Sequence, residues 1–344
     1  MKSGFAAILG RPNAGKSTLL NALTGEKVAI VTPKPQTTRN RIAGVVEVAA
    51  RKGQHPAAQI VFVDTPGVHK PASQLDRRML QEVHEALETR DVVLVLVDAT
   101  RRLRLEPNVT ADKGRRRTPD AANEDEFLFS LVRKLDCPVF LVLTKIDLVN
   151  KDQLLPLIDR LTKQYNFAQV IPVSARKRDG LDVLVRKIVD ALPAGERYYP
   201  KDQYTDQPVR FMVSELIRES VLIETGEEVP YASAVVIEEF EEPPPESKAK
   251  KVTRIAAVIY CERDGQKAIL IGKGGTKLKA IGTGARRKIE SLLGTQVYLE
   301  LHVIVEPGWR ESRGFVDSLD WRSQLEHIAE KQTNEKPAGE DDTQ

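Results

Sequence analysis

The sequence of 344 residues has few cysteines, little net charge and no long apolar run. Its two cysteines, Cys137 and Cys261, lie far apart in strand-like runs, which argues against a disulfide framework and favours reduced, buried thiols in a cytosolic protein. The formal net charge of +3 is too small to indicate nucleic acid by itself, so only local basic clusters can do so. The longest apolar runs, such as residues 92–97, are too short to span a bilayer, and residues 5–9 are too short for a signal peptide.

What the sequence does contain is one glycine-rich stretch between an apolar run and a helical pattern. Its residues are Gly10, Arg11, Pro12, Asn13, Ala14, Gly15, Lys16 and Ser17. Strand, glycine-rich turn and helix are the context of a phosphate-binding loop. The glycines let successive N–H groups point at a phosphate, while Lys16 reaches the outer phosphates and Ser17 offers its hydroxyl to Mg²⁺. The stretch therefore predicts a nucleoside triphosphate site.

Other polar motifs follow the apolar runs downstream. Residues 58–63 end at Asp64-Thr65-Pro66-Gly67, where a carboxylate beside the phosphate loop suits a nucleotide-bound Mg²⁺. Three more apolar runs cover residues 91–99, 137–143 and 168–173, with helical patterns between them. Alternating strands and helices predict an α/β domain with a mostly parallel sheet, helices on both faces and ligand loops at one edge. The length predicts about two domains in all.

The last two loops of this domain favour guanine. They hold Thr144-Lys145-Ile146-Asp147 and Ser174-Ala175. The Asp147 carboxylate can accept two hydrogen bonds, which matches the adjacent N1–H and N2–H₂ donors of guanine. Adenine offers no such pair of donors. The Lys145 stem can lie across the base, and backbone N–H groups near Ser174 can meet the O6 acceptor.

A second, smaller domain is predicted after a polar stretch. The expected order is a helix over residues 209–224, strands over 233–239 and 253–260, short helical patterns around 271–281 and over 285–293, and a strand over 297–305. Between the helical patterns lies Gly272-Lys273-Gly274-Gly275, the G-x-x-G loop that KH domains press against a nucleic-acid backbone. The basic residues around it supply positive charge: Lys273, Lys277, Lys279, Arg286, Arg287 and Lys288.

These motifs, together with Gln36-Thr37-Thr38-Arg39 and the Val68-His69-Lys70-Pro71 that follows Gly67, resemble the Era family of bacterial GTPases. The resemblance implies a GTP-binding domain at residues 1–193, a linker at 194–208, a type II KH domain at 209–310 and a C-terminal extension at 311–344 that is largely disordered towards its end. It implies a GTPase with slow intrinsic hydrolysis that binds small-subunit ribosomal RNA near its 3′ end and acts in subunit assembly. It also implies a monomer in the cytoplasm with peripheral association at the inner face of the cell membrane.

The resemblance assigns roles residue by residue. Mg²⁺ would be held by Ser17, Asp64 through water, and Thr38, with Thr37 as the alternative. Lys16, Thr38, Gly67 and Asn13 would act in hydrolysis. The whole phosphate loop and the later motifs would contact the nucleotide: Asp64, Thr65, Pro66, Gly67, Val68, Thr144, Lys145, Ile146, Asp147, Ser174 and Ala175. RNA would be bound by Gly272, Lys273, Gly274, Gly275, Lys277, Lys279, Arg286 and Arg287.

The sequence departs from the family pattern in several places. Thr144 replaces the usual asparagine, which weakens the expected bridge to the phosphate loop. Extra residues between Arg101 and Glu124, and from Ser323 onward, predict a solvated loop and a disordered tail, with an RNA-touching loop as the alternative for the first. Val68 stands where other GTPases have the glutamine that orients water, and Asn13 resembles the residue that holds K⁺ in potassium-dependent relatives. Two other functions stay open: an RNA-binding module with a structural nucleotide, and an ATPase.

Overall fold

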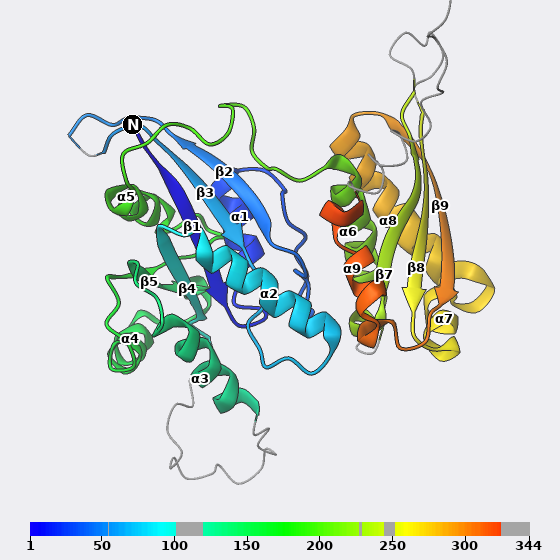
Figure 1. Cartoon of the computed structure of the whole chain (residues 1–344), viewed down its shortest axis with the longest axis horizontal. Helices are drawn as coiled ribbons and strands as arrows, with labels where there is room; N and C mark the ends of the chain where they lie inside the picture. The colour runs from blue at the N-terminus through cyan, green and yellow to red at the C-terminus, as the bar shows by residue number, and fades with distance from the viewer. Residues whose placement is uncertain (54, 101–119, 227–228, 244–251, 325–344) are drawn as a thin grey trace, which may run out of the picture. The chain divides into compact units, whose positions relative to one another are not determined.

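The computed structural model describes residues 1–53, 55–100, 120–226, 229–243 and 252–324. The chain divides into two compact units, one made of Met1–Ala72 with Asp76–Gln207 and the other of Ser73–Leu75 with Pro208–Gln344. Each unit has its own sheet (Figure 1). Residues 101–119 and the residues after 324, which make up most of the expected loop and tail, fall outside this description. Where the structure does describe these two segments, at 120–124 and 323–324, the chain is helical and not a loop or a disordered tail. Within the described ranges, no helix combines the length and the apolar character needed to cross a bilayer.

The sheet of the first unit has the strand order β2-β3-β1-β4-β5-β6. β2 is antiparallel to β3, and every other neighbouring pair is parallel. The strands are β1 (Lys2–Gly10), β2 (Ile42–Val48), β3 (Ala58–Asp64), β4 (Val92–Asp98), β5 (Val139–Thr144) and β6 (Gln169–Pro172). The helices are α1 (Lys16–Thr24), α2 (Gln74–Glu88), α3 (Asp120–Val132), α4 (Leu154–Thr162) and α5 (Leu181–Ala191). The predicted α/β class is confirmed.

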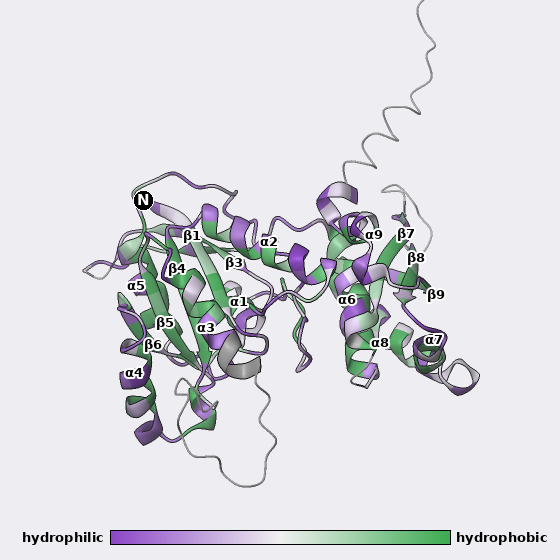
Figure 2. Cartoon of the chain, turned by 60° about the horizontal axis from the view of Figure 1, so that its bottom comes forward, coloured by the Kyte–Doolittle hydropathy of each residue, from purple (hydrophilic) through white to green (hydrophobic). Residues whose placement is uncertain are grey.

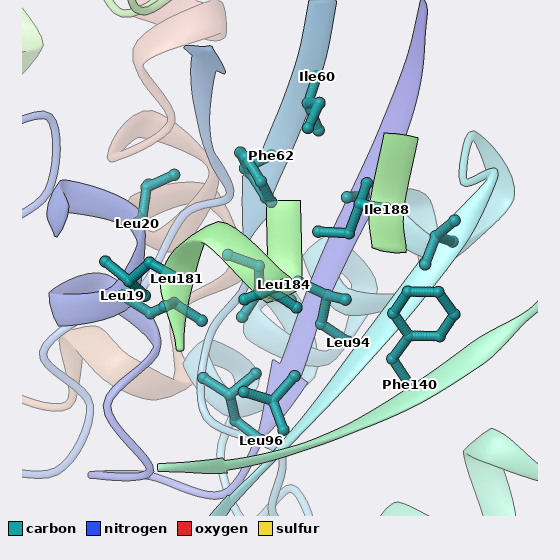
Figure 3. Close-up of a cluster of buried hydrophobic side chains, with 14 of the residues drawn as sticks. Leu19, Leu20, Ile60, Phe62, Leu94, Leu96, Phe140, Leu181, Leu184 and Ile188 are labelled. Carbon is teal, nitrogen blue, oxygen red and sulfur yellow. The ribbon is translucent and has the colours of Figure 1, made fainter. Parts of the chain in front are cut away.

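The strands are apolar throughout because both faces of this sheet are covered. β4 is buried at every residue, as expected for a central parallel strand. Its alternate side chains serve two layers: Leu94 and Leu96 pack with α1 and α5 (Figure 3), whereas Val93 and Val95 pack with α2, α3 and α4. Hydrophilic residues lie on the outer surfaces of these helices (Figure 2). The packed sheet gives a fixed base to the loops at the carboxyl ends of β1, β3 and β5.

Most of the predicted linker, residues 194–208, is bound along the edge of this sheet as far as Gln207. The fully buried Gln59 side chain accepts from the backbone N–H groups of Tyr198 and Tyr199 (2.8 and 3.0 Å). Val45 N–H donates to the Tyr204 carbonyl (2.9 Å), and the Thr205 hydroxyl donates to the Ala43 carbonyl (2.8 Å). The segment therefore satisfies backbone groups of β2 that would otherwise be an open strand edge.

The second unit is an α+β domain with the strand order β7-β8-β9. β7 and β8 are antiparallel, while β8 and β9 are parallel. Its elements are α6 (Val209–Glu224), β7 (Ala234–Glu241), β8 (Val252–Cys261), α7 (Asp264–Ile271), α8 (Thr276–Leu293), β9 (Gln296–Val305) and α9 (Arg313–Ser318). The expected order of helix, two strands, helices and strand is found. The last two helical patterns form one helix, α8, because its buried Ile281, Ala285 and Ile289 pack on the core across the intervening glycines.

The end of the predicted KH domain and the first residues of the predicted C-terminal extension, 311–321, pack together in this second unit. Trp309 is fully buried, and its indole N–H donates to the Ala232 carbonyl (3.0 Å). Phe315 of α9 contacts both Trp309 and Tyr260, and Trp321 lies 6.2 Å from Phe211, centroid to centroid. These two tryptophans are the only ones in the chain. Residues 309–321 therefore belong to the folded unit.

Candidate nucleotide and nucleic-acid sites

The glycine-rich loop leaves β1 and becomes α1 within a few residues. Gly15 caps the helix with a φ of +92°, and Asn13 also has a positive φ, +63°. A Cβ at Gly10 would lie 2.8 Å from the Leu96 carbonyl oxygen, so only glycine fits there without a shift. The loop is therefore held in a curled form, and its helix N-terminus is a ready anion site.

Lys16 is folded back into this loop. Its Nζ donates to the carbonyls of Gly10 (3.2 Å) and Arg11 (3.1 Å), and the residue is only 6% exposed. Burial lowers the pKa of Lys16 to about 8, although the Asp64 charge opposes the change. A cation removed from water in this way gains from a nearby anion such as a phosphate.

Three oxygen-bearing side chains meet beside Lys16. The Ser17 hydroxyl donates to Asp64 Oδ2 (2.7 Å) and lies 2.8 Å from the Thr38 Oγ1. Thr37 is elsewhere, with its hydroxyl bonded to Thr32 (2.7 Å) and to the Lys34 carbonyl (2.6 Å). Of the two threonines that the sequence left open, the structure brings Thr38 to the other expected ligands.

Asp64 has an unused buried oxygen. The residue has no exposed surface, and Oδ1 lacks a hydrogen-bond partner within the described part of the chain. Burial raises the pKa of Asp64 to about 6, against the opposing effects of Lys16 and of hydrogen bonds from Ser17 and Thr38. Hydroxyl and carboxylate oxygens are the ligands that Mg²⁺ prefers, and a site completed by phosphates needs only one or two carboxylates. These residues therefore fit a nucleotide-bound Mg²⁺.

The loop after Asp64 approaches the phosphate loop closely. The Thr65 hydroxyl donates to the Ile8 carbonyl (2.8 Å), and the Val68 N–H donates to the Gly10 carbonyl (3.0 Å). A Cβ on Gly67 would lie 2.8 Å from the Pro12 nitrogen, so glycine is required where the two loops touch. The position of Gly67 is thus fixed from both sides.

Several residues predicted to contact the nucleotide direct their side chains elsewhere. Val68 is 1% exposed and packs with the α2 and α3 side of the core, and Ile146 packs on the same layer. Arg11 pairs with Glu124 and Asp125 at the start of α3. These residues offer only main-chain groups to the site, and Val68 has no side-chain group with which to orient water.

The base-recognition loops are tied to the phosphate loop. The Thr144 hydroxyl donates to the Ala14 carbonyl (2.7 Å), so threonine makes the bridge expected of the usual asparagine. Lys145, at a φ of +59°, donates to the Asn13 carbonyl (2.9 Å) and to Asp98 Oδ2 (2.7 Å). The Lys145 side chain is therefore held by the phosphate loop and by the carboxyl end of β4.

Asp98, at the end of β4, is a site residue that the sequence analysis did not identify. Burial alone would raise its pKa, but hydrogen bonds from Lys145 and Thr100 hold the pKa of Asp98 below the ordinary value. Its position at the carboxyl end of an apolar strand is the signal that could have identified it. Asp98 keeps the ammonium of Lys145 in place.

Asp147 lies exposed, with its Oδ1 accepting from the Ser174 hydroxyl (2.6 Å). Ser174 is 1% exposed and is held by two backbone hydrogen bonds with Asp179, each 3.0 Å long. The structure therefore brings together the two predicted guanine loops, with Ala175 next to the serine. A buried serine orients the carboxylate that would select the base.

The second glycine loop lies between α7 and α8. Gly272, Gly274 and Gly275 have φ values of +73°, +60° and +76°. A Cβ at Gly272 would lie 2.6 Å from the Lys277 Cβ, whereas one at Gly274 or Gly275 would meet nothing within 4 Å. The outer part of this loop is thus open to a ligand.

Positive charge surrounds this loop. Lys273, Lys279, Arg286 and Arg287 are exposed, and within the described residues no ion pair involves them. Lys279 and Arg286 are seven residues apart and share a helix face. Lys277 lies 3.9 Å from Glu224, and Lys288 is neutralised by the buried Glu219 (2.8 Å). Fewer cations near this loop are therefore available to a ligand than the six that the sequence suggested.

Comparison with known proteins gives two family matches. Residues 5–145 match the family described as 50S ribosome-binding GTPase, and residues 228–310 match the KH domain. The GTPase Era of Lacticaseibacillus paracasei is 44% identical over 321 residues, covering 93% of this chain and 97% of the relative.

Two solved structures resemble the chain over nearly its whole length. A variant of Aquifex aeolicus Era bound to GDP and AlF₄⁻ gives a TM-score of 0.80 at 38% identity and covers 92% of this chain and 98% of its own. Era in complex with MgGDPNP and nucleotides 1506–1542 of 16S ribosomal RNA gives 0.79 at 39% identity, with the same coverage.

Proposed function

This chain belongs to the Era family of GTPases, and on that premise we propose that its nucleotide state controls the binding of small-subunit ribosomal RNA near the 3′ end, during assembly of that subunit. One observation carries the proposal. A single chain holds a guanine-nucleotide site with fixed side chains and an open G-x-x-G loop beside four exposed cations. The proposed parts are residues 1–193 for GTP, 194–208 as the connection and 209–310 for RNA.

The base would be chosen by Asp147. Its carboxylate is oriented by Ser174 and would accept from the two adjacent N–H donors of guanine. Asp147→Asn replaces one acceptor with a donor, so GTP affinity should fall and xanthine nucleotides should gain. Equal competition by ATP in the unmodified protein would contradict the assignment.

The triphosphate would be held by the phosphate loop and by Lys16. Ser17, Thr38 and Asp64 would hold Mg²⁺, which neutralises charge on the phosphates when it is bound. Lys16 exchanges its two carbonyl contacts for phosphate oxygens, and the Gly67 N–H would contact the γ-phosphate. Because Val68 cannot orient water, we expect slow intrinsic hydrolysis.

Potassium is the proposed aid to hydrolysis. The Asn13 Nδ2 donates to the Pro33 carbonyl (2.9 Å), so the side-chain oxygen is the atom that would face a cation near the phosphates. A monovalent ion there would offset charge that develops in the transition state, as an arginine finger does. Single-turnover hydrolysis in KCl and in NaCl tests this, and equal rates would reject it.

RNA binding is tested with a fragment equivalent to nucleotides 1506–1542 of 16S ribosomal RNA, the region present in the relative's complex. The double variant Lys273→Asp/Gly274→Asp should lose at least about tenfold in affinity, because a cation is lost and two anions are added. The matched control is Lys52→Asp/Gly53→Asp. This is another exposed Lys-Gly pair, and its glycine, at a φ of +78°, also has open space around it. Equal loss in both, or in neither, would contradict the proposal.

Nucleotide control is tested by measuring the same affinity with GDP and with a non-hydrolysable GTP analogue. Different affinities support the proposal, and identical ones would reduce the nucleotide to a structural ligand. A cytoplasmic location, a monomeric state and peripheral membrane association complete the proposal. Light scattering tests the monomer, and flotation with anionic vesicles tests the membrane association.

A further inference from the structure

One carboxylate joins the two loops that would sense the γ-phosphate. Asp76, in the first turn of α2, accepts on Oδ1 from Gln36 Nε2 (2.9 Å) and lies 3.0 Å from His69 Nε2. Its Oδ2 accepts from the Ala72 N–H (3.1 Å). The residue is 7% exposed. Asp76 therefore contacts one residue from the loop that carries Thr38 and one from the loop that follows Gly67.

Gln36 links Asp76 to the loop that holds Thr38. It lies two residues before Thr38 and has a φ of +55°, a conformation that non-glycine residues rarely adopt. Such a backbone persists when surrounding contacts hold it, and the bond to Asp76 is a contact of that kind. With Gln36 held, Thr38 lies beside Ser17 and Asp64, where it would meet the nucleotide-bound ion.

His69 links Asp76 to the Gly67 carbonyl. Its Nδ1 lies 2.9 Å from the Gly67 carbonyl, and its Nε2 lies 3.0 Å from Asp76 Oδ1. A carbonyl and a carboxylate oxygen both only accept hydrogen bonds. A neutral imidazole carries one N–H, whereas the imidazolium carries two. Both contacts are therefore hydrogen bonds only when His69 is protonated.

The charges around His69 favour that form. The hydrogen bond that His69 donates to Asp76 is the largest influence and raises the pKa of His69, burial opposes it, and the Gly67 carbonyl and the charges of Asp76 and Glu124 raise it further. Glu124, on α3, is itself paired with Arg11. The net result is a His69 pKa above the ordinary 6.5.

We propose that Asp76 and protonated His69 are positioning residues that lock the Thr38 loop and the Gly67 loop together in the arrangement that accepts GTP. The inference rests on the proposed γ-phosphate contacts of Thr38 and Gly67. Neither positioning residue is among those assigned to the nucleotide or to Mg²⁺. Because the lock needs the imidazolium, it weakens as the pH rises through the pKa of His69.

The first test is Asp76→Asn, which keeps the shape of the side chain and replaces an acceptor with a donor. The affinity for a non-hydrolysable GTP analogue relative to GDP should fall about tenfold, the size expected for one hydrogen bond to a charged group. GDP affinity should stay, because GDP lacks the phosphate that the two loops would meet. The control is Asp159→Asn, an exposed carboxylate paired only with Lys163 among the contacts described.

The second test is the pH dependence of single-turnover GTP hydrolysis between about pH 6 and pH 9, a window around and above the ordinary histidine pKa. Titration of Lys16, of Asp64 and of the phosphates affects every variant alike. The unmodified protein and the exposed control His84→Gln should share an extra fall in rate as the pH rises. His69→Gln and Asp76→Asn should lack that fall.

The outcomes separate this inference from the proposed function. Normal hydrolysis by the unmodified protein, with an unchanged affinity ratio in Asp76→Asn or an unchanged pH profile in His69→Gln, would overturn the inference alone. No hydrolysis by the unmodified protein would overturn the proposed function. A melting temperature measured for every variant shows whether each one is folded.

Discussion

Glycine serves opposite purposes in the nucleotide loops of the first unit and in the G-x-x-G loop of the second. Around Gly10 and Gly67, glycine lets backbone segments touch one another, and the nearby Lys16 and Ser17 side chains are already hydrogen-bonded. Around Gly274 and Gly275, glycine leaves open space, and the nearby cations are exposed. The nucleotide loops are organised to close around a small charged ligand, and the G-x-x-G loop is organised to admit the backbone of a polymer.

The largest expected effect is that of Lys16→Met, which tests whether the phosphate loop is prepared to bind an anion. GTP affinity should fall by about 100-fold, because two charge-assisted hydrogen bonds to phosphate are lost. The free protein should melt at the same or a higher temperature, since the lowered pKa of Lys16 reflects a cost of burying its charge. Lys52→Met is the exposed control. Unchanged affinity would mean that Lys16 does not face the phosphates.

Gly67→Ala tests the close contact between the two loops of the first unit. The added Cβ would lie within 2.8 Å of the Pro12 nitrogen, so one loop must move. We expect affinity for a GTP analogue to fall by about tenfold, the cost of one hydrogen bond to a charged phosphate. Gly195→Ala, whose Cβ would meet its nearest neighbour at 3.7 Å, is the control. Equal titration curves for both variants would argue against the contact.

Thr144→Val removes the hydroxyl that bridges to the Ala14 carbonyl and keeps the shape of the side chain. The buried carbonyl loses its partner at a cost of about 1 kcal/mol, which predicts a roughly fivefold loss of nucleotide affinity and a lower melting temperature. Thr162→Val removes an exposed hydroxyl inside a helix and serves as the control. If GTP affinity is unaffected, the bridge has no part in organising the loop.

Gly274→Ala is the smallest change and sharpens the contrast with Gly67. Nothing lies within 4 Å of the new Cβ, so only the positive φ costs free energy, about 1 kcal/mol. Thermal unfolding should shift by a few degrees, with GTP binding unaltered. Gly272→Ala, with its 2.6 Å approach to Lys277, should be the more damaging of the pair. The reverse order would show that the outer glycine is the constrained one.

Much of this architecture could be predicted from local pattern. The apolar runs that form β1, β4 and β5 are buried on both faces, so their composition alone identifies central parallel strands. The glycine-rich stretch was recognisable because strand, turn and helix follow within a few residues. In these places the local sequence determines the local structure.

Other features depend on partners that are distant in the sequence. Thr37 and Thr38 have the same chemistry, and only the path of the loop decides which one meets Asp64. Asp98 is paired with a lysine 47 positions away, and the role of Asp76 appears only once Gln36 and His69 are brought to it. The unbroken helix α8 shows packing of buried residues outweighing the low helix propensity of glycine.

The location of Trp309 and Trp321 gives the molecule a built-in optical reporter. The only two indoles both follow residue 208, so selective excitation collects emission from the second unit and none from the first. A change in that emission upon addition of GTP would report that binding in the first unit alters the surroundings of a tryptophan in the second. The proposed communication between the units can thus be timed in a stopped-flow mixer with the unlabelled chain.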